Sequence, residues 1–81
     1  MKGEKSQDIK TEKYILTLLS KNVRLRRSEL GLSQERLAER ANFHPTYISR
    51  IECGLRNISL ENLYRLAIAL DLSVSELLAE K

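Results

Sequence analysis

Residues 33–54, with the sequence SQERLAERANFHPTYISRIECG, constrain the fold of this chain more than any other segment. They contain two short apolar patterns of helical spacing with a turn signal between them. Ser33 is a natural N-cap for a helix over residues 34–41, because its hydroxyl can accept a hydrogen bond from a free backbone N–H. Asn42 follows, and after glycine it is among the residues that best tolerate a left-handed backbone. The segment therefore predicts a helix that ends in a tight turn at Asn42.

A second helix is expected to begin at Pro45, whose missing N–H suits the first turn of a helix. Ile48 and Ile51 give this helix a buried face, and Gly54 ends it. The side chains left on the outer face can all donate hydrogen bonds: Thr46, Tyr47, Ser49 and Arg50. Two short helices joined by a tight turn, the second with a polar outer face, are typical of a helix-turn-helix. In that motif the second helix lies in the major groove of DNA.

The rest of the chain predicts only helices. Residues 1–10 are polar and are expected to form a flexible N-terminal segment, followed by a single domain over residues 11–81. A long helix is expected from Thr11 to Glu29, and another from Leu60 to Leu70. Ser73 opens the last helix with the pattern S-V-S-E, which is typical of a capping box. We therefore expect an all-α, compact five-helix domain.

Composition narrows the class of protein. The chain has 81 residues and a net charge of +3, which alone is weak evidence for a nucleic-acid partner. Only 5% of its residues are aromatic, which argues against a platform that stacks the bases of RNA or single-stranded DNA. No apolar run approaches the roughly 18 residues that span a membrane, and the start MKGEKSQD does not resemble a signal peptide. We therefore expect a cytoplasmic protein with no membrane partner.

The sequence predicts neither an enzyme nor a metal or cofactor site. It contains no carboxylate pair, nucleophile–base set or glycine-rich phosphate loop that an enzyme could use for catalysis. Cys53 is the only cysteine, which excludes a disulfide within this sequence and a cysteine-based metal framework. We expect Cys53 to be a helix-end residue rather than a redox group. His44 is the only histidine, and we expect it to cap the second helix of the motif or to contact a phosphate.

These residues carry a family resemblance. The strings GLSQERLAER, TYISRIE and SLENLYRLAIAL resemble the lambda-repressor-like, Cro-type helix-turn-helix regulators, also called the xenobiotic response element family. The resemblance covers Leu19 to Leu78. The string TYISRIECGLRNISLENL is most similar to the controller proteins of restriction–modification systems. The resemblance implies a lambda-repressor-like DNA-binding domain.

The resemblance also implies which residues contact DNA. The positions that face base edges are occupied by Pro45, Thr46, Ser49 and Arg50. The positions that contact backbone phosphates are occupied by Gln34, Tyr47, Arg56, Asn57, Ser59 and Asn62. Arg50 is the strongest candidate for direct base readout, because a guanidinium can bond guanine O6 and N7 together.

A structural role is implied for Arg27 and Glu52, which match a pair that forms an internal salt bridge and orients the recognition helix. The chain departs from the family pattern at three positions. Asn42 replaces a glycine, Pro45 replaces a longer polar or basic side chain, and Cys53 replaces an Arg or Asn. We therefore expect a target sequence that differs from those of close relatives.

A single recognition helix contacts too few bases to find one site in a genome, because each mismatched base pair costs only about 1–3 kcal/mol. We therefore expect a homodimer on a pseudo-palindromic operator. The candidate interface residues are Leu72, Val74 and Leu78, which alternatively complete the core.

Glu35 and Glu39 form an acidic pair at helical spacing on the outer side of the first motif helix. In activating members of the resembled family this surface meets RNA polymerase, and the alternative is an ordinary solvated face.

Two functions fit these observations. The first is a sequence-specific transcription factor that regulates its own operon, as an activator, a repressor or both. The second is an antitoxin that masks a partner toxin and autoregulates its operon. Ile15, Leu18 and Leu25 would form the toxin-binding surface, because they lie off the apolar face of the first helix.

Overall fold

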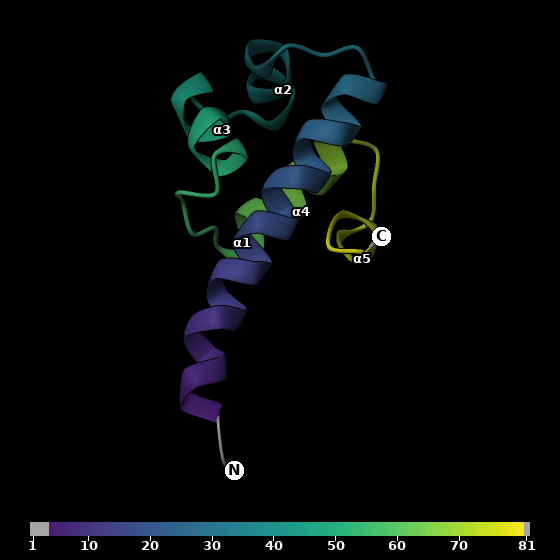
Figure 1. Ribbon diagram of the computed structural model, residues 1–81. Coiled ribbons are helices and arrows are strands. Elements are labelled where there is room, and N and C mark those ends of the chain that lie inside the picture. The colour runs from purple at the N-terminus through teal and green to yellow at the C-terminus, as the bar shows by residue number, and fades with distance from the viewer. Residues whose placement is uncertain (1–3, 81) are drawn as a thin grey trace.

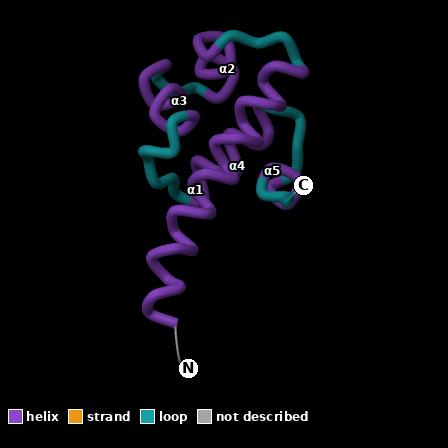
Figure 2. The backbone as a smooth tube through the Cα atoms, in the orientation of Figure 1, coloured by secondary structure: helices purple, strands orange, loops and turns teal. Residues whose placement is uncertain are grey.

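Figures 1 and 2 show an all-helical chain in the computed structural model, which describes the backbone of residues 4–80 and the side chains of residues 12–80. The described residues form five helices and no strand. In chain order these are α1 (Glu4–Glu29), α2 (Gln34–Ala41), α3 (Pro45–Glu52), α4 (Leu60–Ala69) and α5 (Val74–Leu77). This confirms the expected all-α, five-helix fold.

Helix α1 begins at Glu4, whereas the sequence predicted a start at Thr11. Residues 4–10 contain no glycine or proline, so nothing in them stops a helix from extending beyond its packed part. In Figure 1 this first part of α1 projects away from the other helices. The flexibility expected for residues 1–10 stays a prediction, and residues 1–3 lie outside the described residues.

The core is a single cluster of buried apolar side chains to which all five helices contribute. Helix α2 packs against α3 and α4, while α1 packs against α3 and α5. The large side chains that are fully buried come from all five helices: Leu19, Val23, Leu37, Ile48, Ile51, Leu66, Leu70 and Leu77. Because both motif helices contribute to this core, their orientation is fixed by the rest of the domain.

The N-terminal ends of α2 to α5 are all capped by the side chain that precedes the helix. Ser33 accepts a hydrogen bond from the Arg36 N–H at 3.0 Å, and Ser59 caps α4 in the same way. Ser73 and Glu76 form the predicted capping box, in which each side chain accepts a hydrogen bond from the other residue's backbone N–H. These local signals fix where each helix begins.

Left-handed backbone follows four of the helices, and the first case is Gly31 after α1, with a φ of 68°. Asn42 has a φ of 60° and donates its backbone N–H to the end of α2, and Gly54 has a φ of 71° just after α3. Both were predicted from the residue type. Asp71, with a φ of 58° after α4, was not, because aspartate adopts this conformation less readily than asparagine or glycine.

Candidate nucleic-acid interface

Helix α3 has one buried and one open face. Ile48 and Ile51 are fully buried against the neighbouring helices, while Thr46 and Arg50 are exposed and Ser49 is half-buried. Among the described residues, the side chains of these three polar residues make no hydrogen bond or ion pair. Pro45 is exposed at the first turn of α3. The three polar side chains expected to face base edges are therefore free to bind a ligand.

His44 is the N-cap of α3. Its Nδ1 accepts a hydrogen bond from the Thr46 N–H at 3.1 Å. An accepting Nδ1 carries no proton, so a neutral ring carries its proton on Nε2 and keeps one donor on its exposed side. His44 therefore caps α3 through Nδ1 and can still donate a hydrogen bond from Nε2 to a phosphate oxygen. The phosphate contact stays a prediction.

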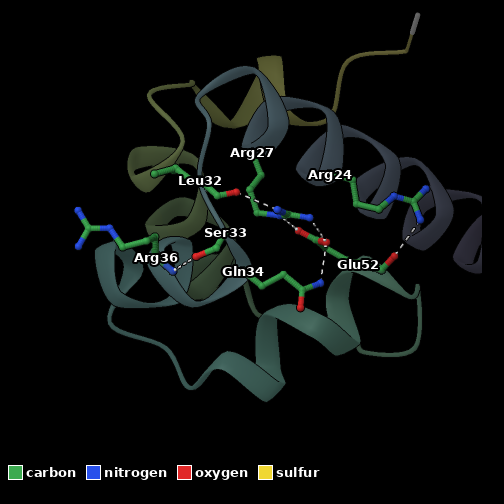
Figure 3. Close-up of polar contacts among 7 residues, drawn as sticks. All are labelled: Arg24, Arg27, Leu32, Ser33, Gln34, Arg36 and Glu52. Carbon is green, nitrogen blue, oxygen red and sulfur yellow. Dashed lines mark hydrogen bonds and ion pairs between the residues drawn. The ribbon is translucent and has the colours of Figure 1, made fainter.

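The Glu52 carboxylate, which is only 3% exposed, anchors the end of α3 to α1 (Figure 3). Arg27 donates from Nε to Oε2 at 2.6 Å and from Nη2 to Oε1 at 3.0 Å. The same guanidinium donates from Nη1 to the Leu32 carbonyl at 2.8 Å. The hydrogen bonds to Glu52 raise the pKa of Arg27 above its ordinary value. The expected pair thus forms a two-point ion pair between the first helix and the recognition helix.

Gln34 joins this cluster from the start of α2, and Figure 3 shows it pointing toward the same carboxylate. Its Nε2 donates to Glu52 Oε1 at 2.9 Å, which leaves one amide hydrogen for the phosphate contact that the family resemblance implies. Arg24 donates to the Glu52 carbonyl at 3.2 Å. The end of α3 is therefore held by α1 at two points and by the start of α2.

Tyr47 lies differently from its predicted position on the outer face of α3. It is half-buried, and its ring packs edge-on against Phe43 with centroids 4.8 Å apart. Its hydroxyl accepts a hydrogen bond from Asn62 Nδ2 at 3.0 Å. The prediction considered only helical spacing, whereas the ring covers apolar surface at the turn that Phe43 fills.

The loop between α3 and α4 lies next to α3 in Figure 2, and it carries exposed polar side chains. Arg56 and Asn57 are exposed, and the Arg56 guanidinium lies 5.4 Å from the centroid of the Tyr47 ring. Ser59 accepts a hydrogen bond from the Asn62 N–H at 3.1 Å and thus caps α4. The contact with the Tyr47 ring places the Arg56 cation beside α3, as a phosphate contact there requires.

The residues predicted for protein contacts fall into two groups. Leu72, Val74 and Leu78 are half-buried and pack against the core, so at least part of each side chain completes it. Glu35 and Glu39 are both exposed on α2, and Glu39 forms an ion pair with Arg36 at 2.8 Å.

Two further residues organise the fold, and the sequence did not single them out. Asn22, buried on α1, donates from Nδ2 to the carbonyls of Leu77 and Ala79 at 2.7 and 2.9 Å, which fixes α5. Arg65 on α4 donates to the carbonyls of Ala41 and Asn42 at the turn of the motif. These contacts join residues far apart in the chain, and no local sequence pattern around Asn22 or Arg65 predicts them.

The described part of the chain contains neither a group of metal ligands nor a membrane-spanning helix. No group of three or more His, Cys, Asp or Glu side chains within it is placed to hold a metal ion. None of its helices combines the length and the apolar character needed to cross a membrane. Cys53 is exposed at the end of α3, as expected for a helix-end residue.

Comparison with known proteins agrees with the geometry of the motif. The family model described as "Helix-turn-helix" matches residues 23–77. Control protein C.SmaI from Serratia marcescens is 45% identical over 67 residues, which cover 83% of this chain and 80% of that protein. Control protein C.BamHI from Bacillus amyloliquefaciens is 43% identical over 65 residues, which cover 79% of this chain and 80% of that protein.

Solved structures give the same result. The restriction-modification controller protein C.AhdI from Aeromonas hydrophila superposes with a TM-score of 0.74 at 40% identity, over 76% of this chain and 94% of that one. The hypothetical transcription factor NHTF from Neisseria superposes with a TM-score of 0.79 at 37% identity, over 84% of this chain and 78% of that one. This chain therefore belongs to the helix-turn-helix family of transcription regulators, and it is homologous to the controller proteins of restriction–modification systems.

Proposed function

We propose that this protein is a sequence-specific regulator that binds double-stranded DNA as a homodimer on a pseudo-palindromic operator and controls its own restriction–modification operon. The observation that carries the proposal is the open face of α3, where Thr46, Ser49 and Arg50 have no partner within the described residues. The opposite face of the same helix is fully buried. A helix fixed on one side and unpartnered on its polar side can enter a major groove without rearrangement.

The contacts divide into two kinds. Pro45, Thr46, Ser49 and Arg50 face base edges, and Arg50 reads a guanine through O6 and N7. The residues around them contact backbone phosphates and set the register of the protein on the duplex: Gln34, His44, Tyr47, Arg56, Asn57, Ser59 and Asn62. The first group supplies specificity and the second supplies most of the affinity.

A homodimer doubles the number of base pairs that are read. The proposed interface is formed by Leu72, Val74 and Leu78, which are half-buried and lie in or directly beside α5. Two-fold symmetry would place two copies of α3 about 34–36 Å apart, in successive major grooves on one side of the DNA.

The experiment that tests this function is selection of binding sites from random duplex DNA with the purified protein. The expected result is an enriched site with two inverted half-sites centred about one helical turn apart. Enrichment of a single half-site by a monomer would contradict the dimer, and no enrichment at all would contradict specific DNA binding.

Contact with RNA polymerase is the proposed role of Glu35 and Glu39. Both are exposed on the outer side of α2 and so remain accessible to a second protein. Glu35→Lys should abolish activation of a reporter while leaving operator binding unchanged in a gel-shift assay. Loss of both properties would show that this surface belongs to DNA binding instead.

The regulator is proposed to act in the cytoplasm, where its operator is accessible. The antitoxin alternative receives no support from the relatives described above, which carry the names of control proteins and transcription factors. Of the three residues predicted to bind a toxin, Ile15 and Leu25 are exposed and Leu18 is half-buried.

A further inference from the structure

We infer that Arg65, which lies on α4 outside the motif, is a positioning residue for DNA binding. In this inference Arg65 acts through Asn62 to orient the Tyr47 hydroxyl toward a DNA phosphate. The inference rests on the proposed function, and it adds a residue and a route of action that the DNA-contact residues named above do not include.

The first step is the contact between Arg65 and the turn of the motif. Its Nη2 donates to the carbonyls of Ala41 and Asn42 at 2.9 and 2.8 Å. Such carbonyls at the end of a helix lack partners within the helix, and a cation there also interacts favourably with the helix dipole. The guanidinium lies over the Phe43 ring, 4.4 Å from its centroid. Arg65 thus contacts three consecutive residues that connect α2 to α3.

The second step leads from Arg65 to α3. Arg65 Nη1 donates to Asn62 Oδ1 at 3.5 Å, and Asn62 Nδ2 donates to the Tyr47 hydroxyl at 3.0 Å. The contact with Arg65 requires the amide oxygen of Asn62 to face the guanidinium, because a guanidinium can only donate. The amide nitrogen must then face Tyr47, so the orientation of the Asn62 side chain is determined by Arg65.

The third step concerns the hydroxyl proton of Tyr47. A phenol that accepts from Asn62 still has its own proton to donate. No acceptor for that proton is found among the described residues, and the Arg56 guanidinium stacks on the same ring. A DNA phosphate beside α3 would accept a hydrogen bond from this hydroxyl. The contacts from Arg65 through Asn62 therefore orient the neutral Tyr47 hydroxyl beside the cationic Arg56 guanidinium before DNA binds.

A double-mutant cycle on operator affinity tests the inference. The single variants are Arg65→Met and Tyr47→Phe, and the control is Arg40→Met. Arg40 lies near the same turn, and its replacement removes the same charge, but it contacts Asp71 at 3.6 Å rather than the turn carbonyls. Dissociation constants are measured at a temperature where circular dichroism shows every variant fully folded.

The expected result is that Tyr47→Phe weakens binding in the parent chain but has much less effect in the Arg65→Met background, a coupling of about threefold or more. Arg40→Met should leave the effect of Tyr47→Phe unchanged. Additive losses, or an Arg65→Met variant that differs from Arg40→Met only in its unfolding temperature, would overturn the inference and leave the proposed function intact. Failure of the parent chain to bind any selected duplex would overturn both.

If Arg65→Met does not fold, Arg65→Lys provides the same test. A lysine keeps the charge but cannot contact two carbonyls and Asn62 together, because it lacks the planar fork of a guanidinium. The same coupling with Tyr47→Phe is expected, and its absence in a folded Arg65→Lys protein would count against the inference.

Discussion

The Glu52 carboxylate accepts three hydrogen bonds, two from Arg27 and one from Gln34. A buried carboxylate is costly to desolvate, and these donors offset that cost rather than add a large net stability. Their main effect is geometric, because they fix the end of α3 relative to α1. Removing one partner therefore has a larger consequence than the net stability of the pair suggests.

Glu52→Ala is expected to lower the free energy of unfolding by about 3 kcal/mol, because it leaves the Arg27 guanidinium without its carboxylate partner. This value is at the lower end for buried pairs, since the Arg27 side chain is 22% exposed. Urea unfolding followed by circular dichroism measures it. Glu39→Ala, which breaks an exposed pair, is the control and should cost at most about 1 kcal/mol. Equal losses in both variants would contradict the structural role of Glu52.

Arg50 and Arg56 are both exposed, and replacing each of them is expected to affect DNA binding in a different way. Arg56→Ala should weaken binding to all duplexes and flatten the log–log dependence of affinity on salt by about 0.9, because one phosphate contact is lost. Arg50→Ala should relax the preference at one base pair by about 1–3 kcal/mol. Titration of each variant against the selected site and its single-base variants distinguishes the two. Interchanged results would mean that base and phosphate contacts are assigned the wrong way round.

At the scale of the helix, the capping box of α5 makes a pH-dependent contribution. The backbone N–H of Ser73, followed by its side chain, holds the pKa of Glu76 below its ordinary value of 4.5. A carboxylate with a lowered pKa in the folded state stabilises that state above the ordinary pKa, and this contribution is lost as the pH falls through the folded-state value.

Replacement of Glu76 by glutamine, which can still form the box but carries no charge, should therefore lower the unfolding temperature at neutral pH. The difference from the parent chain should shrink as the pH falls below 4.5. Thermal unfolding between about pH 3 and pH 7 measures this. A difference that stays constant over that range would show that the charge contributes nothing.

The helix boundaries show what a sequence can and cannot reveal. Ser33, Asn42 and Ser73 each act within three or four residues, so their pattern in the chain was enough to predict the cap or turn that the structure has. Arg65 and Asn22 act on carbonyls 24 and 55 residues away. Such contacts depend on how the helices pack, and no local spacing encodes them.

The same distinction applies within the interface. The open face of α3 was predictable from helical spacing, because Ile48 and Ile51 define the buried side. The half-buried position of Tyr47 was not, because it depends on Phe43 and on Asn62 from another helix.

At the scale of the whole molecule, two apolar surfaces are available for the proposed dimer, one around α5 and one on α4. Leu72, Val74 and Leu78 are half-buried, whereas Tyr64 and Ile68 on α4 are 60% and 55% exposed. Exposure alone would favour α4 as the dimer interface, so variants on the two surfaces are compared directly.

Val74→Lys is expected to yield a folded monomer that binds the operator more weakly, because a charge at the centre of the proposed interface would have to be desolvated without a partner. Ile68→Lys is the matched control on α4 and should remain a dimer. Light scattering coupled to size exclusion measures the mass of each variant. A dimeric Val74→Lys protein together with a monomeric Ile68→Lys protein would move the interface to α4.

The polar side chains of Thr46, Ser49 and Arg50 do not take part in holding α3 within the described part of the chain, since Ile48, Ile51 and Glu52 do that from the other side. Under the proposed function, a mutation at any of the three therefore alters the preferred operator with little effect on the stability of the domain. Duplicated copies of such a gene could diverge in target through a few substitutions, each viable, and so become insulated from one another within a single cell.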